Sequence, residues 1–62
     1  MRVVDLYKVL YNDVFIRIIN ENGEHIMWGK PFDIPLGVLD CIVKSIRKAG
    51  DNSIYDIEIV IE

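Results

Sequence analysis

Two side chains stand out as candidates for nucleophilic or metal-binding chemistry. His25 is the single histidine and Cys41 the single cysteine of the sequence. A catalytic pair made from them would need an orienting third group and an electropositive setting for the thiolate. A zinc site would need further histidine or cysteine ligands. We therefore expect no catalytic residues, no metal and no cofactor, with His25 on the surface beside a turn and Cys41 as a small buried residue.

Three of the scattered carboxylates share one side of the last apolar segment, residues 54–62. Asp56, Glu58 and Glu62 alternate there with isoleucines. A strand with one solvated face explains this pattern without any function. The same carboxylates could instead form an acidic docking face for a basic partner. The sequence has neither a glycine-rich phosphate loop nor a serine-centred nucleophile elbow, so an enzyme is the least favoured class.

The charge of the chain also limits its partners. The formal net charge is -3, whereas a nucleic-acid binder needs a basic face to neutralise phosphates. No apolar run approaches the roughly 20 residues of a membrane span, and no secretory leader is recognisable. With only one cysteine, we expect a protein of the reducing cytoplasm that binds neither nucleic acid nor membrane.

The first half of the sequence predicts a short helix followed by a β-hairpin. Residues 5–11 form the helix, whose first turn Asp5 can cap. Strands at residues 14–20 and 24–30 flank Asn22-Gly23, which is the strongest short signal for a type I′ turn with positive φ at both residues.

The second half has two alternatives after Pro35, which can occupy the first position of a helix. In one, residues 36–48 form a single amphipathic helix, as the apolar periodicity favours. In the other, only residues 36–40 are helical, and residues 41–48 form a strand that turns back into a last strand, residues 54–62. We expect one α+β domain over residues 1–62, a small antiparallel sheet of about four strands with two short helices. The alternative is three strands with one longer second helix.

The predicted hairpin is apolar on both faces. The type I′ register places Arg17 opposite Trp28, with the guanidinium on the indole ring, and Ile19 opposite Ile26. One face carries Val14, Ile16, Ile18 and Met27; the other carries Phe15, Ile19, Ile26 and Trp28. The second group is either the main core or a seam with another chain. A domain of this size buries only roughly 60% of its unfolded surface, and small domains often gain stability by oligomerisation. We therefore expect Phe15, Arg17, Ile19, Ile26 and Trp28 to form the interface of a homodimer or a patch that docks a partner.

A series of short motifs runs along nearly the whole chain. They are Asp-Leu-Tyr-Lys-Val-Leu at residues 5–10, Asn-Gly-Glu at 22–24, Trp-Gly-Lys at 28–30, Asp-Ile-Pro at 33–35, Leu-Asp at 39–40 and Val-Lys-Ser-Ile at 43–46. In this order the chain resembles a loose group of small uncharacterised phage and prophage proteins of Gram-positive bacteria. The resemblance implies a strand for residues 43–46. Two departures, a long insert at residues 48–53 and Gly37 in the second helix, keep the long-helix alternative open.

The resemblance also carries an expectation about function. It implies an accessory protein, located in the host cytoplasm, that blocks a host protein such as a defence component by direct contact. A second hypothesis is a protein that sequesters a small molecule or nucleotide at a dimer seam near Trp28 and Arg17. A regulatory or structural phage protein is a third. This is analogy at the level of the family, because the resemblance supplies no catalytic residues.

Overall fold

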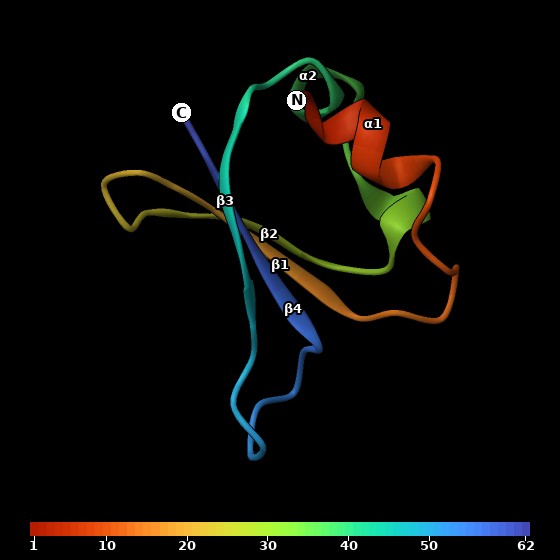
Figure 1. Ribbon diagram of the computed structural model, residues 1–62, viewed down its shortest axis with the longest axis vertical. Helices are drawn as coiled ribbons and strands as arrows, with labels where there is room; N and C mark the ends of the chain where they lie inside the picture. Colours follow the sequence, from red (N-terminus) through yellow and green to blue (C-terminus); the bar gives the residue numbers. More distant parts are fainter.

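A four-stranded sheet organises the computed structural model, which describes all 62 residues (Figure 1). Its strands are β1 (Ile16–Asn20), β2 (His25–Gly29), β3 (Val43–Lys48) and β4 (Ile57–Ile61), in the spatial order β2-β1-β4-β3. The central strands β1 and β4 run parallel, whereas each outer strand is antiparallel to its neighbour. The expected α+β fold, with about four strands and two short helices, is confirmed, and the sheet is mixed where we expected antiparallel pairs throughout.

The position of β4 explains the parallel pair. Ile59 and Ile61 are buried on one side of this strand, and Val60, which points to the other side, is buried too. A strand with apolar side chains on both sides is shielded from water best at the centre of a sheet, where it has a neighbouring strand on each edge. β4 therefore lies between β1 and β3.

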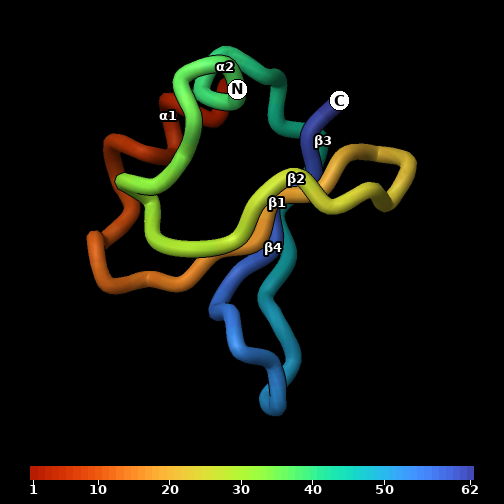
Figure 2. Tube along the Cα trace, turned by 180° about the vertical axis from the view of Figure 1, so that it is seen from behind, coloured from red at the N-terminus to blue at the C-terminus, as the bar shows by residue number.

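The short helices cover one face of the sheet. They are α1 (Val3–Tyr7), α2 (Leu36–Leu39) and the single 3-10 turn η1 (Pro31–Asp33). Figures 1 and 2 show α1 and α2 next to each other at one end of the molecule. The main core lies between these elements and the sheet, and consists of Val3, Leu6, Ile16, Ile18, Ile34, Ile59 and Ile61.

Helix α1 begins earlier and ends earlier than predicted. Val3 and Leu6 are its buried residues, whereas Val9 and Tyr11 are exposed beyond its end. Asp5 caps the first turn as expected, because its Oδ2 atom accepts a hydrogen bond of 2.9 Å from the backbone N–H of Arg2.

The alternative of one long helix over residues 36–48 is wrong. Helix α2 ends at Leu39, and the chain then enters β3, which pairs antiparallel with β4. The start of this strand is also tied to the N-terminus, since Val3 N–H donates to Cys41 O and Val43 N–H donates to Met1 O. These non-local hydrogen bonds stabilise the strand more than the apolar periodicity would stabilise a helix. The β-branched residues of this segment also favour a strand over a helix.

The hairpin turn differs from the predicted type I′ geometry. Gly23, with φ of 85°, is the only residue of the turn with positive φ, so the prediction of positive φ at Asn22 is wrong. Gly23 N–H donates to Asn20 O at 2.9 Å, which closes a turn with Glu21 and Asn22 at its centre. The Asn20 side chain stabilises this wider loop, because its Oδ1 atom accepts from the backbone N–H groups of Asn22 at 3.0 Å and Glu24 at 2.9 Å.

The wider loop shifts part of the strand register. Ile19 faces His25, and not Ile26 as predicted, because one extra residue bulges out of β2. Beyond the bulge the predicted register is confirmed, with Arg17 opposite Trp28.

We expect Gly23→Ala to lower the free energy of unfolding by about 1 kcal/mol, since an L-residue is strained at positive φ. Nothing lies within 4 Å of the added Cβ, so the loss would come from the backbone alone. Asn22→Ala is the matched control and should cost less than about 0.5 kcal/mol. Urea unfolding followed by circular dichroism measures both. A larger loss for Asn22→Ala than for Gly23→Ala would contradict the observed turn.

Candidate functional site

The face of the sheet opposite the main core has no helix over it. Arg17 lies in register with Trp28 on β2 and with Glu58 on β4, so the three side chains share this face. The chain reaches the same face once more, through Ile54 and Tyr55 in the connection between β3 and β4. We call this surface the open face.

The sequence singled out five residues as a candidate interface, Phe15, Arg17, Ile19, Ile26 and Trp28, and the structure places Phe15 and Arg17 beside Trp28. None of them belongs to the main core, so they are not the principal packing group of the fold. The Phe15 and Trp28 rings lie 5.3 Å apart between centroids, and the indole is 49% exposed. Ile26 is 38% exposed, whereas Ile19 is buried within the sheet. We call these five residues the hairpin patch.

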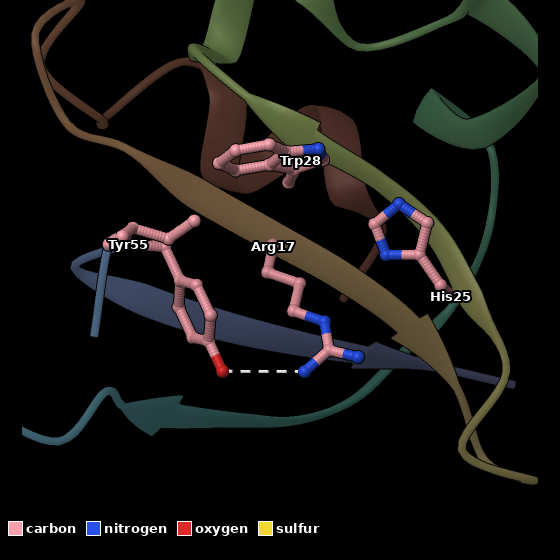
Figure 3. A pocket seen from close by; sticks show the side chains of 5 residues that line it. Arg17, His25, Trp28 and Tyr55 are labelled. Carbon is pink, nitrogen blue, oxygen red and sulfur yellow. Dashed lines mark hydrogen bonds between the residues drawn. The ribbon is translucent and has the colours of Figure 1, made fainter. Parts of the chain in front are cut away.

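Arg17 does not lie on the Trp28 indole as expected, although the two residues are opposite each other. Its guanidinium carbon is 5.7 Å from the centre of the Tyr55 ring instead. Its Nη1 atom donates to the Tyr55 hydroxyl at 3.3 Å (Figure 3) and lies 3.4 Å from Glu58 Oε2. Tyr55 therefore takes the place that the sequence assigned to the indole, which leaves Trp28 free on one side.

Two arginines share one carboxylate on the open face. Glu58 contacts Arg17 through Oε2 and Arg47 through Oε1, and the second contact is the shorter, at 2.6 Å. The Glu58 side chain is only 14% exposed, so its charge is largely shielded from water. Because two positive groups face one negative group, this cluster carries an excess of positive charge although the chain as a whole is acidic.

A pocket of about 240 Å³ opens beside this cluster. Its walls come from Arg17 on β1, His25 and Trp28 on β2, and Ile54 and Tyr55 before β4 (Figure 3). A guanidinium has five N–H donors, and the hydrogen bonds of the Arg17 side chain use only Nη1. The pocket therefore has mainly aromatic and aliphatic walls with the Arg17 side chain among them, which suits an apolar group that has a carboxylate next to it.

The three residues of the expected acidic docking face are placed differently from one another. Asp56 Oδ2 accepts a hydrogen bond of 2.9 Å from the backbone N–H of Phe15. Glu58 is paired with arginines, and Glu62 is exposed after the end of β4. Two of the three carboxylates thus serve contacts within the chain.

His25 and Cys41 lie in different parts of the molecule. His25 lines the pocket on the open face, whereas Cys41 packs against the main core, and its Sγ atom lies 3.6 Å from Gly37 O. The structure contains no group of three or more His, Cys, Asp or Glu side chains with the arrangement of a metal site. None of its helices has the length and apolar character needed to span a membrane.

Sequence reasoning missed the roles of Tyr55, Ile54 and Arg47. Strand alternation placed Tyr55 on the same side as Ile57, but β4 begins only at Ile57, and the preceding residues form bends. The Arg47–Glu58–Arg17 alignment follows from β4 lying between β1 and β3, which no local pattern indicates.

Comparisons of the chain with protein-family models, with curated proteins and with solved structures each found no match. The function is therefore inferred from the side chains of the open face itself.

We expect Glu58→Gln to lower the free energy of unfolding by about 1–2 kcal/mol. Hydrogen bonds to charged groups contribute roughly 1.5–3 kcal/mol, and the exposure of Arg47 reduces that value. Glu21→Gln is the control, because its ion pair with Lys44 is exposed on both sides and should contribute less than about 0.5 kcal/mol. Thermal unfolding of both variants tests this order, and equal losses would show that the Glu58 cluster is no stronger than a surface pair.

Proposed function

We propose that this chain is a non-enzymatic binding protein that acts by contact with another protein through its open face. The observation that carries the proposal is the half-exposed Trp28 beside a pocket that Arg17 helps to line. Tryptophan and arginine dominate the energetics of protein interfaces when a partner removes them from water. Here both side chains are held by a sheet, so little conformational freedom is lost on binding.

The charge of the open face supports a particular kind of partner. Arg17 and Arg47 outnumber Glu58, and the His25 side chain lines the pocket beside them. A partner segment with an acidic side chain next to an apolar one would place its carboxylate at Arg17 and its apolar group against Trp28. The complementarity of charge would fix the orientation of the partner, while the indole would supply most of the affinity.

The resemblance to phage and prophage proteins supports a biological setting for this activity. In that setting the partner is a protein of the host, such as a defence component, which the chain occludes in stoichiometric amounts. The support is the order of motifs along the sequence together with a surface suited to contact. A regulatory role within the phage would use the same surface.

The pocket favours a second candidate function, the sequestration of a small anion with an aromatic or apolar part. Arg17, Tyr55 and Trp28 converge on the cavity as they would around such a ligand. Its volume of about 240 Å³ is below the roughly 300–1,000 Å³ of most small-molecule sites. A protein side chain therefore fits it better than a nucleotide, and we rank protein binding first.

The test is capture from host lysate on immobilised protein, with three variants compared in parallel. Trp28→Ala and Arg17→Ala should each weaken binding of the captured protein by at least ~10-fold, as for interface hot spots. Phe32→Ala is the matched control, because Phe32 is a 64% exposed aromatic residue on η1 and should bind like the unchanged chain.

Two outcomes would contradict protein binding through the open face. One is a captured protein whose affinity depends on Phe32 and not on Trp28. The other is purified protein that carries a small molecule with nucleotide absorbance and loses it on Arg17→Ala, which would establish the second candidate instead. Melting curves of all variants show whether each one is folded.

A further inference from the structure

The bulge in β2 decides on which side of the sheet His25 lies. Ile19 on β1 faces His25, and Ile26 is the extra residue of β2. In an unbroken ladder Ile26 would face Ile19, and His25 would face Asn20 on the side of the main core. Arg17 and Ile19 are two residues apart on β1, so both point to the open face. The bulge therefore brings the imidazole to the open face as well.

This placement makes His25 a wall of the pocket beside Trp28 and Arg17 (Figure 3). Trp28 is directly opposite Arg17, so His25 occupies the neighbouring diagonal position, which is within reach of a long side chain. The hydrogen bonds and ion pairs of the chain do not use the imidazole. Bulges often direct a side chain towards a functional site, and here the side chain has no structural partner to explain its position.

We propose that His25 is a binding residue of the pocket whose imidazolium attracts a carboxylate of the partner, so that binding strengthens as the pH falls. This inference rests on the proposed function, because it concerns the same acidic partner and the same pocket. Histidine ordinarily changes its charge between about pH 5 and 8, whereas carboxyl groups ordinarily titrate near about pH 4. Lowering the pH from about 7.5 to 5.5 therefore adds a positive charge at the pocket while the partner keeps its negative charge.

The groups around His25 do not reverse this direction. The charged or titratable side chains on the elements next to it are Arg17 on β1, Glu21 and Glu24 in the turn, Tyr55 before β4 and Glu58 on β4. Glu21 pairs with Lys44, Glu24 accepts a hydrogen bond from Asn20, and Glu58 lies between two arginines. Side chains of these types ordinarily keep one charge state between about pH 5.5 and 7.5. The charge that changes at the pocket is then that of His25.

The test uses N-acetylphenylalanine, which has a carboxylate next to a phenyl ring, and N-acetylphenylalanine amide as its neutral counterpart. The pocket of about 240 Å³ has room for the ring, since a cavity of roughly 150 Å³ holds benzene. Fluorescence of Trp28, the only tryptophan of the chain, reports binding. We expect the acid to bind about 3- to 5-fold more tightly at about pH 5.5 than at pH 7.5, as for one exposed ion pair. The amide should bind equally at both pH values.

Two variants show whether the effect comes from the imidazole at the pocket. His25→Gln keeps a polar side chain without a titrating charge, and it should bind the acid equally at both pH values. The double variant His25→Gln/Phe32→His returns an imidazole to the chain on η1, away from the open face, where Phe32 is 64% exposed. It should also show no pH dependence. The amino terminus titrates near neutral pH as well, but it is present in every chain compared.

Four results would overturn the inference. They are no binding of the acid at either pH, equal binding of the acid by the unchanged chain at both pH values, the same pH dependence for the amide, and pH dependence that persists in His25→Gln or returns with Phe32→His. Circular dichroism at both pH values shows whether each chain is folded, and the comparison of acid with amide needs only the unchanged chain. Capture of a host protein that depends on Trp28 and Arg17 would still support the proposed function, so the two failures are distinguishable.

Discussion

The constraint on which this structure depends is that its helical segments are enough to cover only one face of the sheet. The two helices and η1 are each five residues or fewer, and the residues that α1 buries, Val3 and Leu6, belong to the one main core. The core isoleucines of β1 and β4 receive this cover. The residues that alternate with them point away from it, and Arg17 is among these. The open face is thus the side of the sheet that these short helical segments leave uncovered.

The open face is nevertheless stabilised by specific contacts. Glu58 is largely buried there, and two arginines from the strands on either side neutralise it. A buried carboxylate without such partners would be strongly unfavourable, so the cluster allows a charged residue to occupy a central strand. The same cluster orients Arg17 towards Tyr55 and thereby shapes the pocket. Stability of the sheet and geometry of the candidate site therefore depend on the same side chains.

Much of the fold could be predicted from the sequence, because local patterns report alternation and turn propensity. They located β1, β2 and β4 to within a few residues and placed Arg17 opposite Trp28, whereas the periodicity of residues 36–48 favoured a helix where β3 lies. They did not predict the turn geometry, which depends on hydrogen bonds from the Asn20 side chain to the loop backbone. They also did not predict the parallel β1–β4 pair, because the order of strands in space is not encoded in the alternation of any one strand. The hairpin patch was predicted from its composition. Arg47 belongs to the candidate site because of that strand order, whereas Ile54 and Tyr55 belong to it because the chain bends before β4 begins.

The most direct measurement of an uncovered face is the environment of Trp28, which is the only tryptophan of the chain. Its fluorescence therefore reports on the open face with no contribution from another indole. We predict red-shifted emission that acrylamide quenches readily, followed by a blue shift and protection from quenching when a partner protein binds. A blue-shifted emission that acrylamide barely quenches in the isolated monomer would contradict an uncovered face, because the indole would then lie inside the fold.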